Sequence, residues 1–252
     1  MQFAMANLSF LLYKFLEKKL ARVEPRTFNK NTDIDPSEGH KFHAELTIPY
    51  IKNKKVLDIG CWSGQYTALI KNDAKSVVAI DPNKKAIDFA KKTIKGVNFI
   101  QGSALNLPFK SGSFDVVIFM DVIEHIPFGT EKECIKEINR VLRRNGKLIM
   151  STCHRSFPSV ILDPGFWAMG HRHYSKRELT HFLKKENFHV DNVFIRGGFW
   201  LFLSVFINTL TKHILRIKYD YPKFLKRKIY EDYRNKGVIA IYLFATKTSN
   251  TN

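Results

Sequence analysis

Cysteine is scarce in this chain, which has three in 252 residues, Cys61, Cys134 and Cys153. They are too few and too scattered for a disulfide framework or a Cys-x-x-Cys metal site. A reducing, cytoplasmic setting is therefore the simpler expectation. The N-terminus also lacks the charged lead, long apolar core and small-residue cleavage site of a secretory signal, so we expect no signal peptide.

Acidic residues are few beside basic ones, with 23 Asp and Glu against 41 Lys and Arg and a formal net charge of +18. Such a surplus attracts nucleic acid, anionic lipid or phosphorylated substrates. The lysines are dispersed, as is typical of solvated faces, and no arginine-rich tail or interleaved aromatic patch accompanies them. Nucleic acid is therefore an open partner but not the favoured one.

The apolar run at residues 199–207 is too short to span a bilayer, which needs about 20 residues. Basic residues follow it at positions 212, 216 and 218. As a helix, the run would be apolar on nearly every side. It fits a lid over an apolar pocket, an anchor on an anionic membrane surface, or a buried helical insertion.

A stripe of apolar residues near the N-terminus predicts an amphipathic helix. Its positions are Leu8, Leu11, Leu12, Phe15, Leu16 and Leu20. This helix packs on its own domain, covers a substrate pocket or lies on a membrane surface.

We expect one domain, in which residues 1–44 hold this helix and a lead-in. Residues 45–155 form the ligand-binding core, and residues 156–252 form substrate-side loops, a late helical insertion and closing strands.

A glycine loop follows an apolar strand at residues 55–64, Lys-Val-Leu-Asp-Ile-Gly-Cys-Trp-Ser-Gly. The apolar part predicts a buried parallel strand, the glycines permit a tight turn close to a ligand, and residues 65–70 can begin a helix. A ligand would then lie at the N-terminus of that helix. The Gly-x-Gly-x-x-Gly spacing of dinucleotide folds is missing, because Gly60 and Gly64 stand four apart, and this weakens a hydride-transfer function.

Strands and helices alternate along the chain in the way that builds a parallel sheet covered by helices. Expected strands are residues 55–59, 76–80, 97–101, 114–120, 147–151, 190–195 and 237–246, and expected helices are 65–70, 84–95, 132–142 and 175–186. The last of these helices opens with a capping box of Ser175 and Glu178. The predicted fold class is α/β, with a Rossmann-like, doubly wound, mostly parallel seven-stranded sheet that ends in an antiparallel hairpin.

Polar residues follow several of the expected strands, and ligands of open α/β sheets lie outside the carboxyl ends of strands. Asp81 ends the second strand, where a carboxylate can accept hydrogen bonds from both hydroxyls of a ribose. A helix N-cap ahead of Pro82 is its alternative role, and both roles can hold together. Ser103 and Asp121 follow the third and fourth strands.

The order of these segments resembles that of the class I S-adenosylmethionine-dependent methyltransferases. Within this class it is most similar to the small-molecule group, which has methyltransferase domains of types 11 and 23. The resemblance spans about residues 45–155. Its motifs are Asp58-x-Gly60, Asp81 about twenty positions later, Gly102-Ser103-Ala104, Leu107-Pro108-Phe109, Phe114-Asp115-Val116-Val117 and the segment from Asp121 to Ile126. The combined order is far more specific than any one motif.

The resemblance implies S-adenosylmethionine as the cofactor and a set of residues that bind it. They are Asp58, Gly60, Cys61, Trp62, Gly64, Asp81, Pro82, Ser103, Ala104, Asp121 and Val122. Asp121 would attract the cofactor's ammonium group. Two positions depart from the family pattern, since Ser103 stands where an aspartate near the adenine is usual and Trp62 stands where the middle glycine is usual.

Glu124 and His125 resemble a segment of quinone-pathway O-methyltransferases that is implicated in divalent-metal binding. Here Asp121 replaces the first glutamate of that segment, and one carboxylate pair with a histidine does not define a closed site, so we predict no metal.

Four histidines are candidate bases for a hydroxyl acceptor, His125, His154, His171 and His173. Structural roles are the alternative for each. His125 can bridge the backbone of its loop, and residues 170–174 can order a loop before the next helix.

The predicted function is that of an S-adenosylmethionine-dependent methyltransferase acting on a small or lipid-linked acceptor. Oxygen is the expected acceptor atom, and nitrogen and carbon stay open. We expect a cytoplasmic chain with an additional, peripheral membrane setting, and we expect residues 199–207 and the N-terminal helix to cover one acceptor pocket. RNA or tRNA methylation is the alternative that the charge favours, but an Asn-Pro-Pro-Tyr-type motif is absent. A cofactor-binding protein without catalysis is the third interpretation.

Overall fold

The computed structural model describes residues 36–163, 166, 170–208, 210, 211, 215 and 219–248. The amphipathic helix predicted between residues 8 and 20 lies outside the described residues.

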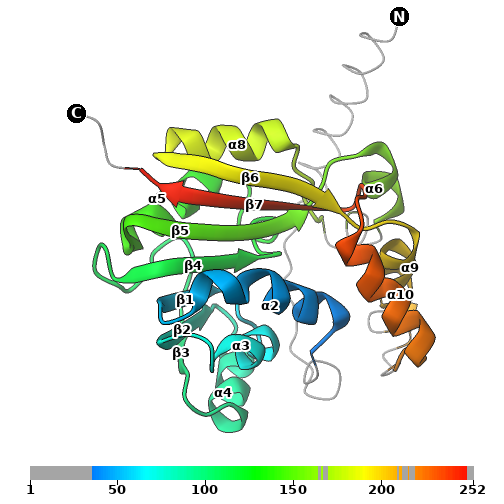
Figure 1. Cartoon of the computed structure of the whole chain (residues 1–252), viewed down its shortest axis with the longest axis horizontal. Coiled ribbons are helices and arrows are strands. Elements are labelled where there is room, and N and C mark those ends of the chain that lie inside the picture. Colours follow the sequence, from blue (N-terminus) through cyan, green and yellow to red (C-terminus); the bar gives the residue numbers. More distant parts are fainter. Residues whose placement is uncertain are drawn as a thin grey trace, which may run out of the picture.

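One seven-stranded sheet forms the centre of the molecule, with the strand order β3-β2-β1-β4-β5-β7-β6 (Figure 1). The strands are β1 (Lys55–Ile59), β2 (Ser76–Asp81), β3 (Asn98–Gln101), β4 (Phe114–Met120), β5 (Leu142–Cys153), β6 (Phe188–Arg196) and β7 (Ala240–Lys247). Strands β1 to β5 pair in parallel, and β7 runs antiparallel to both β5 and β6. The predicted α/β fold with a closing antiparallel hairpin is confirmed.

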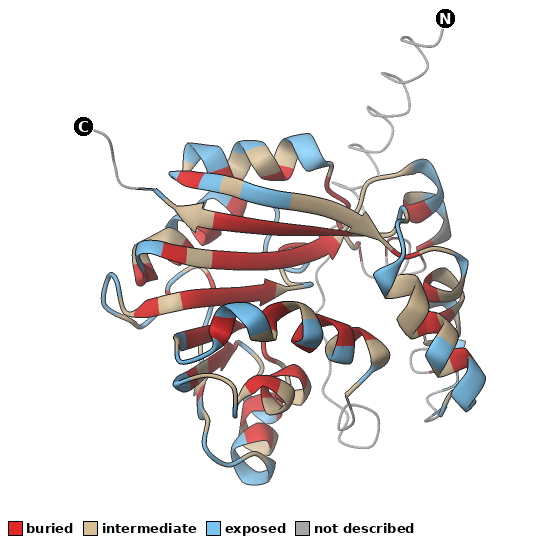
Figure 2. Cartoon of the chain, viewed as in Figure 1, coloured by how far each residue is buried: buried red, intermediate tan, exposed pale blue. Residues whose placement is uncertain are grey.

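Helices cover both faces of the sheet because neighbouring residues of its central strands point to opposite sides. Val116 and Ile118 of β4 pack with α2 (Glu38–Ile51) and α3 (Gln65–Ile70). Val117 and Phe119 pack with α5 (Glu131–Val141) and α8 (Lys176–Lys185). Helix α4 (Lys84–Thr93) packs beside β2 and β3. Figure 2 shows the result, with buried residues running along the central strands.

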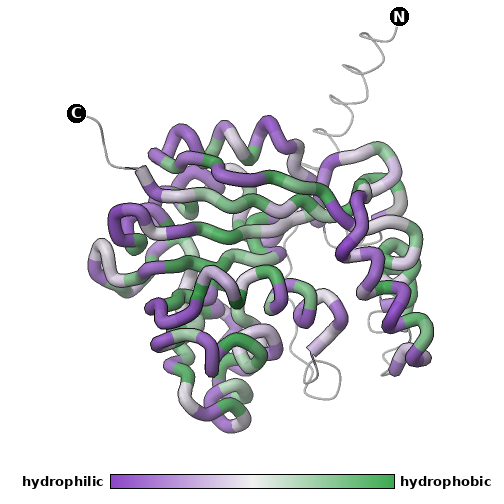
Figure 3. Tube along the Cα trace, viewed as in Figure 1, coloured by the Kyte–Doolittle hydropathy of each residue, from purple (hydrophilic) through white to green (hydrophobic). Residues whose placement is uncertain are grey.

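Three late helices gather at one end of the sheet, on the right in Figure 1. They are α6 (Phe157–Leu162), α9 (Phe199–Asn208) and α10 (Lys223–Arg234). Helix α9 is the apolar segment noted in the sequence. Helix α10 was not predicted, and it packs on α9 through Leu225 and Ile229, which lie beside Leu201. Figure 3 shows hydrophilic positions recurring along α10, as an amphipathic helix requires.

Several local features follow from single residues. The capping box at α8 is confirmed, because Ser175 and Glu178 each accept a hydrogen bond from the other's backbone. Strand β5 starts at Leu142 rather than at residue 147, and Asn145 within it has a φ of 58°. Helix α2 runs across the division expected between residues 44 and 45. Among the described residues, the helices are all too short or too polar to cross a membrane.

Candidate functional site

The loop between β1 and α3 is built from backbone in the left-handed region. Gly60, Trp62 and Gly64 have φ values of 78°, 50° and 81°. A side chain at Gly60 would collide with Val122, since its Cβ would lie 2.3 Å from Cγ2 of that residue. Trp62 adopts a conformation that glycine takes without strain, which is the physical reason that glycine is usual at this position.

Asp81 holds this loop from the neighbouring strand. Its Oδ2 accepts a hydrogen bond from the backbone N–H of Trp62 at 3.0 Å, and its Oδ1 accepts one from Asn83 at 2.8 Å. The N-cap of α4 is Asn83, whose Oδ1 accepts from the Ala86 N–H at 3.0 Å. The alternative role of Asp81 as the helix cap is therefore wrong, and its buried carboxylate belongs to the loop.

Two predicted cofactor residues lie behind the loop. Asp58 is buried in β1 and accepts a 2.6 Å hydrogen bond from the Thr67 hydroxyl in α3. Burial raises the pKa of Asp58 to about 7, against the effect of the Thr67 hydrogen bond. The side chain of Cys61 packs in an apolar cluster with Ala79 and Ile87. Both residues support the loop from inside the protein.

The segment after β3 forms a tight turn. The hydroxyl of Ser103 accepts a hydrogen bond from the Leu105 N–H at 3.2 Å, and Ala104 is buried in the main core with Leu107. Exposed Pro82, after β2, accepts a hydrogen bond at its carbonyl from the Gln101 side chain at 3.3 Å. These residues stand where the sequence predicted, at the carboxyl ends of parallel strands.

Asp121 stands at the carboxyl end of β4 with a φ of 53°, in the left-handed region that a non-glycine residue seldom occupies. Strand β5 fixes it there, because its N–H donates to the Ser151 carbonyl at 3.0 Å and its Oδ1 accepts from the Ser151 hydroxyl at 2.6 Å. The side chain is half-exposed. Backbone strain held by neighbouring structure is typical of functional positions. We call the ends of β1, β2 and β4, with Gly60, Asp81 and Asp121, the cofactor edge.

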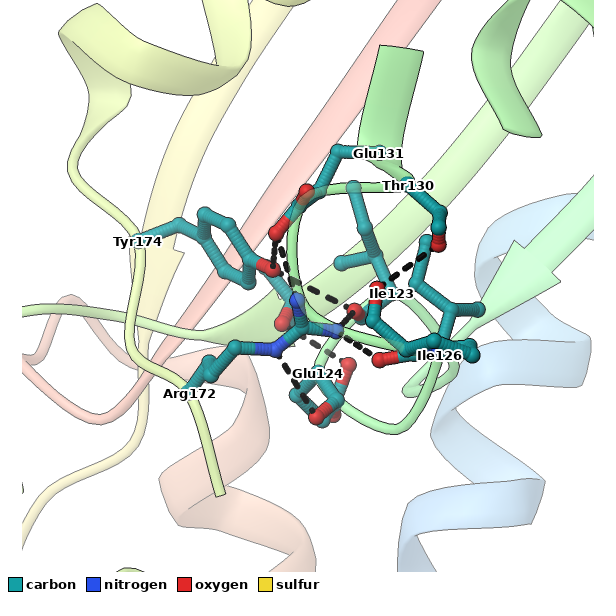
Figure 4. Close-up of polar contacts among 9 residues, drawn as sticks. Ile123, Glu124, Ile126, Thr130, Glu131, Arg172 and Tyr174 are labelled. Carbon is teal, nitrogen blue, oxygen red and sulfur yellow. Dashed lines mark hydrogen bonds and ion pairs between the residues drawn. The ribbon is translucent and has the colours of Figure 1, made fainter. Parts of the chain in front are cut away.

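Arg172 fastens the loop that follows β4 (Figure 4). Its guanidinium is fully buried and donates to the carbonyls of Ile123, Glu124 and Ile126 and to the Glu131 carboxylate. Tyr174 adds a hydrogen bond from its hydroxyl to Glu131 at 3.1 Å. The sequence suggested that residues 170–174 order a loop before α8, but they also order the loop after β4.

A cavity of about 390 Å³ opens beside the cofactor edge. His125, His171 and His173 line it, and we call it the histidine cavity. Its other polar lining includes Asp121, Glu124, Cys153 and Asp163, and its apolar lining is Pro158, Phe199, Phe202, Val205, Val238 and Ile239. The apolar run of α9 therefore forms one wall of the cavity.

The four candidate histidines have different surroundings. His171 and His173 both face Asp163, with a ring nitrogen of each 3.4 Å from its Oδ2. Burial lowers the pKa of His173 to about 4, so this ring is neutral at physiological pH. His125 is exposed, and its ring centroid lies 4.7 Å from that of His171. His154 is not part of the cavity lining, and its Nδ1 lies 3.1 Å from the Val238 carbonyl.

Glu124 lies at the inner side of the cavity. It is buried and accepts a 2.8 Å hydrogen bond from the Thr152 hydroxyl. Burial, together with the nearby charge of Asp121, raises the pKa of Glu124 to about 8.

Sequence reasoning missed Asp163, Cys153 and Arg172 as residues of this site. Asp163 is one acidic residue between a short helix and the next loop, and nothing near it in sequence marks a function. The sequence held one signal for Arg172. An arginine between two histidines would be costly to bury without hydrogen-bonding partners.

The donor set at the cofactor edge fits S-adenosylmethionine. A buried carboxylate, Asp81, suits the hydroxyls of a ribose, and the half-exposed carboxylate of Asp121 suits an ammonium group. Asp81 ends β2 and Asp121 follows β4, so the two carboxylates stand on opposite sides of the switch between β1 and β4.

Comparisons with known proteins agree with this geometry. A family model described as a methyltransferase domain matches residues 57–150. A probable S-adenosylmethionine-dependent methyltransferase of Mycobacterium tuberculosis is 30% identical over 126 residues, which cover 50% of this chain and 44% of the relative. A ubiquinone biosynthesis O-methyltransferase of Pelagibacter ubique is 32% identical over 115 residues, 44% of this chain and 47% of the relative. The chain spans about half the length of the curated relatives it matches.

Solved structures share the fold. The PH0226 protein of Pyrococcus horikoshii superposes with a TM-score of 0.61 at 21% identity, covering 89% of this chain and 97% of that one. A putative methyltransferase of Bacillus halodurans gives a TM-score of 0.59 at 20% identity, covering 82% and 99%. Residues 57–150 thus match a methyltransferase domain, the chain shares its fold with solved methyltransferase structures, and the cofactor that these matches imply is S-adenosylmethionine.

Proposed function

We propose that this chain transfers the methyl group of S-adenosylmethionine to a hydroxyl oxygen of an apolar or lipid-linked small molecule. One observation carries the proposal: the histidine cavity joins Asp121, at the cofactor edge, to the apolar side chains of α9. An acceptor with an apolar body and one polar end fits a cavity lined in this way.

The cofactor edge would hold the donor through two carboxylates. Asp81 would accept hydrogen bonds from the ribose hydroxyls, and Asp121 would bind the ammonium group. The left-handed backbone from Gly60 to Gly64 brings the loop close to that ligand without side chains in the way. Ser103, a neutral acceptor, would make a weaker bond to the adenine than the usual aspartate.

When bound, S-adenosylmethionine supplies an electrophilic methyl group on a sulfonium sulfur. The chain's own work is then to align the acceptor oxygen and to exclude water. Phe199 and Phe202 form the apolar wall that does the second task. Arg172 does part of the first, because it fixes the loop that carries both Asp121 and His125.

His125 fits best as the group that takes the proton from the acceptor hydroxyl. It lines the cavity, and it follows Asp121 by four residues. His154 is not part of the lining, His173 is a weak base because its pKa is lowered, and His171 faces Asp163. A positioned histidine contributes about 10²–10⁴-fold to such a step.

Two relatives support an apolar acceptor. They are named as a demethylmenaquinone methyltransferase, from Thermotoga maritima, and as a ubiquinone biosynthesis O-methyltransferase. Both names refer to quinones, and an acceptor of that kind combines an oxygen with an apolar ring.

The rim of the cavity fits an acceptor that resides in a membrane. Phe199 is 65% exposed although it also lines the cavity, and Phe157, next to the lining residue Pro158, is 79% exposed. Helix α10, whose sequence is rich in lysine and arginine, lies at the same end of the molecule (Figure 1), where its basic residues could contact anionic headgroups. We therefore propose a peripheral membrane setting, which sedimentation with anionic and neutral liposomes would test.

The direct test of the function is a transfer assay with methyl-labelled S-adenosylmethionine and separate pools of lipid extract, RNA and small metabolites. We expect label in an organic-soluble product. Label only in RNA, or no transfer by a folded chain that binds the cofactor, would contradict the proposal. The Phe202→Ala variant should lose lipid labelling and retain cofactor binding.

A further inference from the structure

We propose that the histidine cavity holds a divalent transition-metal ion, bound by Cys153, Asp163 and His171. One ligand atom from each residue lies within 4.8 Å of the other two. These residues come from β5, from the end of α6 and from the loop before α8, so the fold alone brings them together.

The separations suit a metal after a small adjustment. Bonds of about 2.0–2.3 Å in a tetrahedral zinc site put ligand atoms about 3.3–3.7 Å apart. The Nδ1 of His171 already lies 3.4 Å from Oδ2 of Asp163. The cluster, whose ligand atoms lie within 4.8 Å, would need to close by at most about 1.5 Å to reach tetrahedral distances.

The burial of the three residues also suits a metal. Asp163 is 9% exposed, and Cys153 and His171 are partly buried, so the cluster is shielded but open to the cavity. Three protein ligands leave a fourth position for water or an acceptor atom, as in catalytic zinc sites.

An ion pair alone does not account for the cluster. A carboxylate between two imidazoles explains the position of Asp163, but it leaves Nε2 of His171 buried with no hydrogen-bond partner among the described residues. Buried polar atoms are nearly always satisfied, so an atom without a partner in this cluster indicates a group that the described residues do not supply. A thiol in the same cluster adds a donor that an ion pair does not use.

The donor set selects the class of metal. Thiolate and imidazole favour zinc, cobalt or iron, whereas magnesium and calcium prefer oxygen ligands. Neighbouring groups would support the ligands. His173 lies 3.4 Å from Asp163, and Oε1 of Glu124 lies 4.0 Å from Sγ of Cys153. Partners of this kind orient metal ligands.

Metal binding as such does not depend on the proposed methyl transfer. A role for the ion in holding the acceptor oxygen does rest on the proposed function. The test therefore measures binding of Zn²⁺ and Co²⁺ alone, with calorimetry of S-adenosylmethionine as a separate readout on the same samples.

The experiment titrates Zn²⁺ into the chelator-treated full chain against a chromophoric chelator, and records the visible and near-ultraviolet spectrum with Co²⁺. We expect one equivalent of Zn²⁺, no competition by Mg²⁺, and a sulfur-to-cobalt charge-transfer band. Cys153→Ser should abolish the band. Asp163→Asn and His171→Ala should weaken Zn²⁺ binding by more than the about 10–100-fold that loss of an outer-shell partner costs.

Two matched variants serve as controls. Cys134→Ser removes a buried thiol in α5, and His189→Ala removes an exposed imidazole on β6, so both should bind Zn²⁺ like the unaltered chain. A folded chain that binds no Zn²⁺, or that binds it equally in all three ligand variants, would overturn the proposal. A chain that binds Zn²⁺ through these residues but transfers no methyl group would overturn the proposed function and leave the metal site standing.

Discussion

The cofactor edge and the histidine cavity lie side by side but are built in different ways. The cofactor edge uses backbone, with left-handed residues at Gly60 and Trp62, and single carboxylates at strand ends. The histidine cavity uses side chains from the loop after β4, from β5, from α6 and from α9. The difference shows that one end of the sheet can carry both a turn of fixed backbone geometry and a cavity assembled from side chains of separate loops and helices.

Arg172 holds the loop that connects the two regions, so its replacement should have the largest effect on stability. The Arg172→Ala variant leaves Glu131 and three carbonyls without their buried partner. We expect a loss of about 3–5 kcal/mol in the free energy of unfolding. Urea denaturation measures it, with exposed Arg177→Ala as the control. A loss below about 1 kcal/mol would show that the loop after β4 is held by other contacts.

The second effect concerns Asp58, which supports the loop of the cofactor edge from inside the protein, and it depends on pH. The raised pKa of Asp58 means that the folded chain keeps a proton that the unfolded chain releases above about pH 4. Stability from this group is therefore complete below the unfolded pKa and is lost as pH rises to about 7, by on the order of 4 kcal/mol.

Urea unfolding at pH 5 and pH 8 tests this pH dependence. Asp58→Asn keeps an acceptor for Thr67 and removes the titration, so its unfolding free energy should vary less with pH than that of the unaltered chain. Equal pH dependence in both proteins would contradict the burial account.

The third prediction concerns the histidine cavity. His125→Ala should lower kcat by about 100-fold or more, because the acceptor hydroxyl loses its proton acceptor. The dissociation constant for S-adenosylmethionine should stay unchanged. His154→Ala is the control, since His154 is not part of the cavity lining. Unchanged turnover in both variants would remove histidine base catalysis at His125.

The smallest effect separates strain from contact in the loop after β1. Gly60→Ala should destabilise the chain by about 1–3 kcal/mol more than Gly129→Ala. Both glycines have positive φ, but only the Cβ at position 60 would strike Val122, and nothing lies within 4 Å at position 129. Thermal unfolding of the two variants measures the difference. Equal losses would mean that the contact with Val122 relaxes freely.

Much of the fold could be predicted because its signals are local. The strand at residues 55–59, the capping box at Ser175 and the apolar run of α9 each follow from neighbouring residues. Helix α10 was not predicted, because its apolar positions are spaced among lysines that resemble a solvated face. Helix α2 was not predicted either, because its buried side chains include His43 and Thr47, which interrupt the apolar stripe that marks a helix in a sequence.

The residues of the site also differ in whether they could be predicted from sequence. Asp81 and Asp121 could be predicted because they directly follow strands, and strand ends meet at one edge of the sheet. The grouping of Cys153, Asp163 and His171 could not, because it depends on how three separate elements fold over the end of the sheet. Arg172 is similar, since its partners stand more than forty residues away.

The most direct test of the division between the two regions is a calorimetric titration of S-adenosylmethionine into the unaltered chain, Asp81→Ala and Phe202→Ala. The account predicts binding by the unaltered chain, equal affinity in Phe202→Ala, and a loss of about 10–100-fold in Asp81→Ala, since a hydrogen bond to a charged group contributes about 1.5–3 kcal/mol. Equal affinity in all three folded proteins would contradict it.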